Sequence, residues 1–163
     1  FGNIREPIQD SFSVRLSPGE QKWADQRSRW KKLSENISFA EGPPNKLIEH
    51  YNKSRLCVHG YQGTAFLELI SFDFPSIVIL DMDVEPLRKN VRKDFEELEK
   101  VKIVHFSAAS AATHVNEVWD NIDSWWFDKK TVEAKKTFKE KFCRTRSDPA
   151  DYFKKIVEKL IKE

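Results

Sequence analysis

The chain has 163 residues, 39% of them hydrophobic and 33% charged, which predicts one globular domain with a sizeable core. Its 28 basic and 26 acidic residues leave a net charge of +2, too little for an overall field that attracts nucleic acid or an anionic membrane surface. Two cysteines argue against a disulfide framework or a four-cysteine zinc site, and no apolar run approaches the roughly 20 residues of a membrane-spanning helix. We expect a cytoplasmic protein without a transmembrane segment, and Phe1 indicates that upstream sequence is missing.

Two strands and two helices are predicted in the first third of the chain. Alternating apolar residues predict the first strand, and aromatic residues at helical spacing predict the helix after it. A short second strand follows, and a Pro-Pro pair opens the second helix. In chain order these elements are expected at 12–16, 20–33, 37–39 and 43–51.

Three near-continuous apolar runs then alternate with helical patterns. Runs of this kind are typical of parallel strands that are buried on both faces of a sheet. The sequence therefore predicts an α/β fold, a Rossmann-like mostly parallel sheet with helices on both faces. The strands are expected at 56–58, 76–80 and 102–106, and the helices at 64–72, 85–100 and 107–121, the last of them capped by Ser107 or Ser110.

The last forty residues differ in character. From residue 123 onward the sequence is helical and highly charged, with aromatic and aliphatic residues that recur at roughly helical intervals. We expect residues 1–122 to form the Rossmann-like domain and residues 123–163 a C-terminal helical extension packed on it. The pair Trp125-Trp126 suggests either core packing or a platform for a ligand, and the spacing favours the core.

Residues 56–68 carry the most informative pattern in the chain. They predict a buried strand, a Gly-containing turn and the start of a helix, a geometry whose free N–H groups bind phosphate. Thr64 adds a hydroxyl at the helix start, and Glu68, one turn later on the same side, is placed to reach a sugar hydroxyl. The alternative is an ordinary strand-to-helix turn in which Gly63 supplies backbone freedom, and this segment alone favours neither.

Polar residues follow several of the predicted strands. In an open parallel sheet, ligands bind beyond the carboxyl ends of the strands, so these residues predict a binding crevice. Each also has a structural alternative: a solvated arginine, a satisfied buried imidazole, or an aspartate that caps the next helix. The residues at this edge are Arg15, Ser17, His59, Gly63, Thr64, Asp81, Asp83, His105 and Ser107.

The stretch 77–83 suggests a second kind of chemistry. Four apolar residues followed by Asp81-x-Asp83 resemble the nucleophile motif of haloacid-dehalogenase-type phosphatases, in which the first aspartate attacks phosphate and the pair organises Mg²⁺. Val84-Glu85 replaces the residues expected after that motif, and no later segment supplies further metal ligands. The sequence therefore favours a site without metal.

The chain from about Val14 onward resembles the C-terminal half of a family of transferases of GT-B glycosyltransferase type, linked to surface carbohydrate assembly. The same layout is similar to the glycerophosphotransferases of teichoic acid synthesis, whose Arg-x-His-Pro motif corresponds to 15–18. Ser17 stands where those enzymes have histidine, so no role is carried over to it. The matching segments are 15–18, 54–56, 59–68, 75–79 and 116–126.

This resemblance implies the donor-binding half of a transferase that uses a nucleotide-activated sugar or alditol. Such enzymes stabilise the departing nucleotide with positive charge and helix-end amides, without an obligatory metal or other cofactor. The acceptor site and the general base belong to an N-terminal domain absent from this chain. This chain alone is therefore expected to bind the donor without turnover, in the cytoplasm or at the surface of the inner membrane. The implied donor-binding residues are Arg15, His59, Gly63, Thr64, Glu68 and Asp81.

Two other functions stay open at this point. One is the phosphatase-like hydrolase that uses Asp81 and Asp83. The other is a non-catalytic α/β module whose aromatic C-terminal helices dock a protein partner. No nucleic-acid partner is expected from the charge balance.

Overall fold

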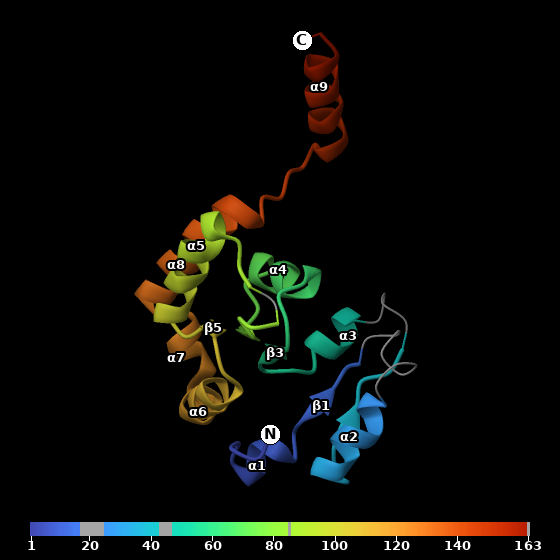
Figure 1. Ribbon diagram of the computed structural model, residues 1–163, viewed down its shortest axis with the longest axis vertical. Helices are drawn as coiled ribbons and strands as arrows, with labels where there is room; N and C mark the ends of the chain where they lie inside the picture. Colours follow the sequence, from blue (N-terminus) through green and yellow to red (C-terminus); the bar gives the residue numbers. More distant parts are fainter. Residues whose placement is uncertain (17–24, 43–46, 85, 163) are drawn as a thin grey trace.

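The computed structural model describes residues 1–16, 25–42, 47–84 and 86–162 (Figure 1). Its main sheet has three parallel strands in the order β3-β4-β5, formed by Cys57–His59, Ser76–Ile79 and Val104–His105. Val58 pairs with Ile77, and Val78 pairs with Val104. These strands confirm the three predicted apolar runs and the parallel direction.

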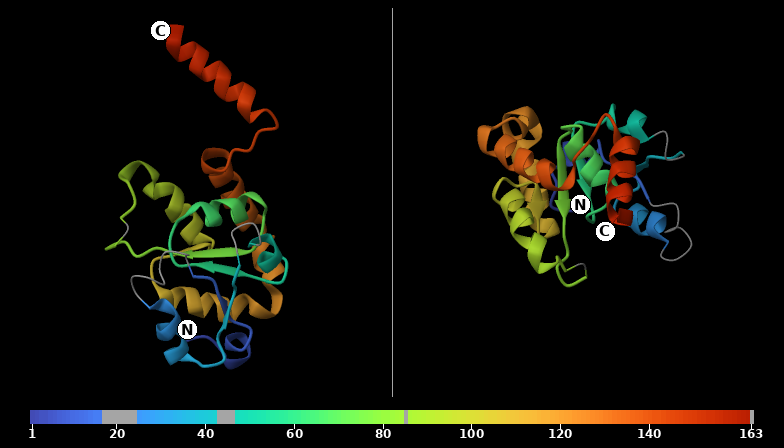
Figure 2. Two further views of the ribbon diagram at one scale, coloured as in Figure 1. Left: turned by 90° about the vertical axis from the view of Figure 1, so that its right-hand side faces the viewer. Right: turned by 90° about the horizontal axis from the view of Figure 1, so that it is seen from above.

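Helices cover both faces of this sheet, which confirms the α/β expectation. Helix α4 (Thr64–Ser71), α5 (Lys89–Lys100) and α8 (Lys129–Phe142) pack with Val78 around one core. On the opposite face, α1 (Glu6–Gln9) and α6 (Ala108–Val118) pack with Ile77 around a second core. The left view of Figure 2 shows α4 and α5 above the strands and α6 beneath them. Neighbouring residues of β4 thus face opposite cores, as a strand requires.

The first two strands form a small sheet of their own. β1 (Ser13–Val14) pairs in parallel with β2 (Ser38–Phe39), and they lie with α2 (Gln26–Leu33) beside the main sheet (Figure 1). Phe12 anchors this unit through its ring, 5.8 Å from that of Trp30. The strands predicted at 12–16 and 37–39 therefore form a separate two-stranded sheet and do not extend the main sheet.

Several predicted helix boundaries need correction. The helix expected at 85–100 begins at Lys89, because Arg88 is extended, with ψ 141°. The helix expected at 107–121 has Ser107 as its N-cap and passes into a 3₁₀ turn, η3 (Trp119–Asn121). The helices expected at 20–33 and 43–51 are described as α2 and as α3 (Leu47–Tyr51). Their predicted starts, and position 85, lie outside the described residues.

The C-terminal helices divide into two groups. α7 (Ile122–Trp126) and α8 pack on the body, and the indole of Trp126 is fully buried and donates to Asp73 O at 2.8 Å. Trp125 donates to Val101 O at 2.8 Å, so both tryptophans belong to the core. α9 (Pro149–Lys162) stands clear of the body (Figures 1 and 2). Within the described part of the chain, no helix combines the length and the apolar character needed to cross a membrane.

Candidate functional site

The turn between β3 and α4 presents a helix start at the carboxyl edge of the main sheet. β3 ends at His59, and α4 begins at Thr64 with Gly63 as its N-cap. No side chain caps this helix, and the first amide to reach a carbonyl is that of Phe66, which donates to Gly63 O at 3.1 Å. The amides of Thr64 and Ala65 have no acceptor among the described groups. Such a helix end attracts phosphate.

Gly63 serves shape in this turn rather than backbone freedom. Its φ of −139° and ψ of 179° are extended backbone that any residue adopts. A Cβ at this position would lie 2.6 Å from Cε2 of Tyr61. The glycine therefore lets the Tyr61 ring lie against the chain, beside the free amides of α4.

An apolar pocket of about 350 Å³ opens next to this turn. Its volume falls within the roughly 300–1,000 Å³ typical of small-molecule sites. Gln62, which precedes Gly63, and Leu67, one helical turn after Thr64, line the pocket, so it shares a wall with the helix end. Arg88 adds a cation. The remaining lining residues are apolar and come from the end of β4, the segment before α5, and helices α5 and α8: Leu80, Pro86, Leu87, Val91, Phe95, Phe138 and Phe142.

This pocket could not be predicted from the sequence. Phe95 on α5 and Phe138 on α8 recur at helical spacing, the pattern of core residues, and both are buried. Their rings approach edge to face with centroids 5.3 Å apart, and both side chains line the pocket together with Gln62. Only the convergence of two helices distant in sequence creates the hollow.

The charges of Arg15 and Glu68 both act on the phenol of Tyr51. Burial raises the pKa of Tyr51 to about 12, the Glu68 carboxylate adds to the increase, and the Arg15 guanidinium opposes it, so both charges are close to the phenol. Arg15 also donates from Nη2 to Gly42 O at 2.8 Å. The structure thus brings Arg15 toward α4, with part of its guanidinium occupied at the end of β2.

His59 turns its ring toward the core. The ring meets Phe66 edge to face with centroids 5.7 Å apart, and the Nε2 atom is buried with no partner among the described residues. Burial lowers the pKa of His59 to about 4, so the ring is neutral near pH 7. In this conformation the Nε2 atom of His59 is buried and is not exposed at the surface of the turn.

His105 is a satisfied buried imidazole. Its Nε2 donates to Lys102 O at 3.0 Å, which leaves Nδ1 to accept from the Ser110 hydroxyl at 2.9 Å. The ring of His114 lies 5.5 Å away by centroids and meets Trp125 edge to face. The sequence left two roles for His105, a residue of the binding crevice or a hydrogen-bonded imidazole of the core, and the structure shows the second.

Asp81 holds the turn after β4. Its Oδ1 accepts from the amides of Asp83 and Val84, at 3.0 and 3.3 Å, so it caps this turn and not the following helix. Within 1–16, 25–42, 47–84 and 86–162, no three His, Cys, Asp or Glu side chains gather in a way that would hold a metal ion. Ser17, which was also expected at this edge of the sheet, lies outside the described residues.

We expect Asp81→Asn to leave the fold intact, because an amide oxygen accepts the same two bonds. The free energy of unfolding in urea should change by less than about 1 kcal/mol. The phosphatase alternative makes a different prediction, namely Mg²⁺-dependent release of phosphate from a phosphomonoester by the wild type that disappears in Asp81→Asn. We expect no such release from the wild type. Reproducible release that the substitution abolishes would establish the hydrolase instead.

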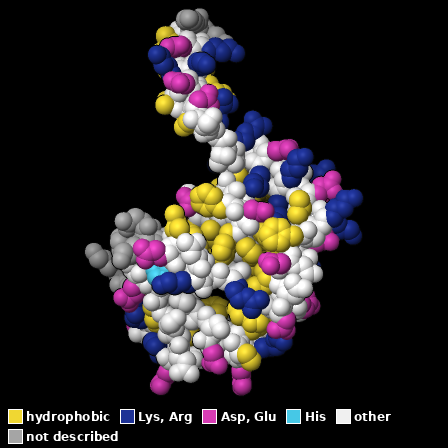
Figure 3. Space-filling view, turned by 180° about the vertical axis from the view of Figure 1, so that it is seen from behind, with side chains coloured by type: hydrophobic (Ala, Val, Ile, Leu, Met, Phe, Trp, Pro, Cys, Tyr) yellow, Lys and Arg dark blue, Asp and Glu magenta, His cyan; other side chains and the backbone are white. Residues whose placement is uncertain are grey.

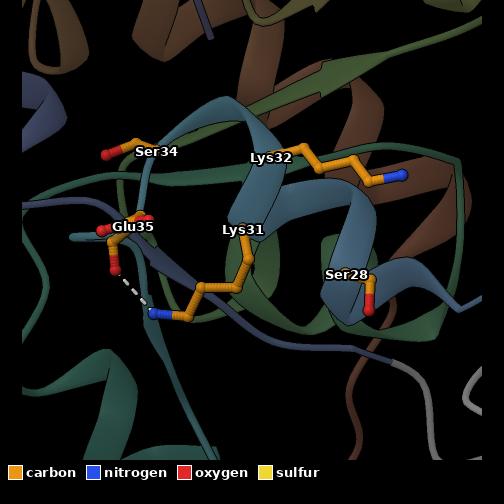
Figure 4. Close-up of a pocket in the computed structure, with 5 residues that line it drawn as sticks. All are labelled: Ser28, Lys31, Lys32, Ser34 and Glu35. Carbon is orange, nitrogen blue, oxygen red and sulfur yellow. Dashed lines mark hydrogen bonds between the residues drawn. The ribbon is translucent and has the colours of Figure 1, made fainter.

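A wider hollow of about 720 Å³ lies along α2 and the residues after it. Figure 4 shows its lining side chains spread apart, with Lys31 Nζ donating to Glu35 O at 2.6 Å. Among the described residues, no aromatic or aliphatic side chain lines it: the lining residues are Ser28, Lys31, Lys32, Ser34 and Glu35. The turn before α4 and its apolar pocket therefore remain the better candidate.

Comparison with known families identifies the chain. The family model described as LIC12162 family transferase matches residues 1–157. The chain belongs to this transferase family. The match includes the turn before α4, the pocket residues of α5 and α8, and most of α9. It supports a transferase and leaves the GT-B type and the teichoic-acid similarity as proposals.

A leucine aminopeptidase, "Leucine aminopeptidase 1" of Phaeosphaeria nodorum, is 28% identical over 85 residues. These residues make up 52% of this chain and 19% of that protein, so the chain spans less than a fifth of its length. Too little of either chain is matched to transfer a role to any residue. No solved structure matches this member of the family.

Proposed function

We propose that this chain is the donor-binding half of a transferase that uses a nucleotide-activated sugar or alditol in surface polysaccharide assembly. The observation that carries the proposal is the uncapped start of α4, which lies at the carboxyl edge of a parallel sheet and shares a wall with an apolar pocket. Membership of a transferase family supports a group-transfer reaction. A ligand that is anionic at one end and flat and apolar at the other suits both parts of the site.

In this proposal the donor diphosphate lies over Gly63 and Thr64 at the start of α4, where the amides of Thr64 and Ala65 have no acceptor among the described groups. The helix dipole and these N–H groups stabilise negative charge as the nucleotide departs. The Thr64 hydroxyl donates a further hydrogen bond, and Glu68 accepts from a donor hydroxyl one turn later. The nucleobase enters the pocket lined by Phe95 and Phe142, where aromatic walls suit a flat ring.

The other predicted site residues take supporting roles. Arg15 supplies positive charge from the β1–β2 side, and the second oxygen of Asp81 contacts a donor hydroxyl. His59 stabilises the turn without contacting the donor, because its ring packs on Phe66 of α4. The general base and the acceptor site are proposed to lie on a separate N-terminal domain, so this chain binds without turnover.

Replacing Thr64 with Val tests the proposal. The change keeps the shape and removes one hydroxyl, so affinity for a nucleoside diphosphate should fall by about 0.5–3 kcal/mol. Isothermal titration calorimetry of the 163-residue chain with a panel of nucleoside diphosphates, without added metal, measures the affinity. Bound nucleotide should also raise the melting temperature, because it stabilises only the folded state.

Thr113→Val is the matched control. Thr113 is an exposed threonine on α6, on the opposite face of the sheet, so its loss should leave nucleotide affinity unchanged. If Thr64→Val and Thr113→Val bind the nucleotide equally well, Thr64 is not part of the site. If no nucleotide binds the wild type, the proposal fails as a whole.

A further inference from the structure

The net charge of +2 conceals a strong asymmetry along the chain. Residues 129–163 carry 12 Lys and Arg against 6 Asp and Glu, a net charge of +6. The preceding 128 residues hold the other 16 basic and 20 acidic residues, a net charge of −4. The chain therefore has a basic C-terminal region, whose charge is cancelled in the overall balance by the acidic remainder.

Within this region helix α9 carries four lysines against two acidic residues, a net charge of +2, and it separates its apolar and charged side chains into two faces. At 100° per residue, its apolar side chains fill one half of the helix and its charged side chains the other. Lys154 and Lys159 lie at the two borders between these halves, while Asp151 and Glu158 lie in the middle of the polar half. The apolar half consists of Tyr152, Phe153, Ile156, Val157, Leu160 and Ile161, with Pro149 and Ala150.

This apolar half faces solvent. Phe153 is 68% exposed, Leu160 is 65% exposed and Ile161 is 78% exposed. α9 projects from the end of α8 and stands away from the body in each ribbon view (Figures 1 and 2). Seen from behind, hydrophobic and charged side chains both lie on its surface, well apart from the hydrophobic side chains in the middle of the body (Figure 3). The body as described therefore does not cover this face.

We propose that α9 lies in the surface of an anionic lipid membrane, with its apolar half in the acyl boundary and its lysines at the headgroups. An amphipathic helix with aromatic and leucine side chains on one face and lysines on the other has the composition of such interfacial helices. Lys154 and Lys159 border the apolar half, so their stems cover apolar surface while their ammonium groups reach anionic headgroups.

Vesicle flotation of the chain, with residues 1–163 intact, tests this surface. The protein should bind vesicles of phosphatidylcholine mixed with phosphatidylglycerol, bind poorly to phosphatidylcholine alone, and be released by high salt. The double variant Phe153→Ser/Leu160→Ser should weaken binding about tenfold or more, because two apolar side chains no longer enter the membrane. Lys154→Gln/Lys159→Gln should weaken binding to the mixed vesicles and flatten its salt dependence.

The matched control is Phe72→Ser/Leu33→Ser. Phe72, the C-cap residue of α4, is 72% exposed and Leu33 on α2 is 60% exposed, so the same chemical change occurs away from α9. Circular dichroism confirms that each variant is folded. Equal vesicle binding by the α9 variant and the control, or binding that ignores phosphatidylglycerol, overturns the proposal. A second outcome would also overturn it: the wild type fails to bind vesicles but self-associates, and the α9 variant is monomeric. In that case the apolar half of α9 is a protein interface. Neither result depends on nucleotide binding at α4.

Discussion

Acidification from about pH 7 to about pH 5 should remove roughly 2 kcal/mol of stability through His105 alone. Burial lowers the pKa of His105 to about 4, whereas the unfolded chain titrates near its ordinary value of 6.5. Between these values the unfolded state binds more protons than the folded state, so the free energy of unfolding falls as the pH falls. This stability is fully present above pH 6.5 and is lost as the pH drops toward 4.

Two further histidines act in the same direction. Burial lowers the pKa of His59 to about 4 and also lowers the pKa of His114, although the Glu117 carboxylate partly opposes the shift at His114. His114 contributes through a buried Nε2 that has no partner in the described part of the chain. Urea unfolding followed by circular dichroism at a series of pH values measures the combined effect.

The variant His105→Asn isolates one of these contributions. Asparagine keeps a polar group near the Ser110 hydroxyl but does not titrate, so the variant should be less stable at pH 7 and lose less stability on acidification. The difference between the two slopes is the quantity of interest, because carboxylate titration is common to both proteins. Parallel pH profiles for the wild type and the variant would contradict the assignment.

Asp73→Asn should cost about 2–4 kcal/mol of unfolding free energy, a large effect for an isosteric change. It removes the carboxylate beside Lys135, whose side chain is only 3% exposed and whose Nζ lies 2.7 Å from Asp73 Oδ1. Lys135 Nζ also donates to Trp126 O at 2.9 Å and lies 3.8 Å from the centroid of the Trp126 ring. A buried ammonium without its counter-ion lowers the free energy of unfolding. Because Asp73 itself is half-exposed, we expect a smaller loss of stability than for a fully buried ion pair.

Three comparisons define this ion pair. Lys135→Met removes the charge and keeps the apolar stem, so it should cost only about 1 kcal/mol. The double variant Asp73→Asn/Lys135→Met should be close to Lys135→Met alone, because the carboxylate matters only while the ammonium is present. Glu96→Gln is the surface control, since Glu96 pairs with Arg92 across an exposed helix turn and should cost less than about 0.5 kcal/mol. Equal losses for Asp73→Asn and Glu96→Gln would show that burial does not set the cost.

The main sheet and its helices could be predicted because their signals are local. β4 is Ser76 followed by three apolar residues, and α6 begins after Ser107, one of its two candidate capping serines, whose Oγ accepts from Ser110 N at 3.2 Å. Apolar runs and capping residues act within one strand or one helical turn. The start of α4 at Thr64 was predicted on the same grounds. The phosphate role of that helix end stays a prediction.

The remaining features depend on contacts between segments that are far apart in the chain. Trp126 reaches Asp73 across 53 positions and Lys135 reaches it across 62, so periodicity assigns these residues to helices without indicating their partners. The pocket beside Gln62 forms only where α5 and α8 converge. Helices α8 and α9 both have amphipathic sequence patterns, yet α8 buries Phe138 while α9 exposes Phe153. The sequence of a helix defines its apolar face, and the surroundings of that helix in the folded chain determine whether the face is covered.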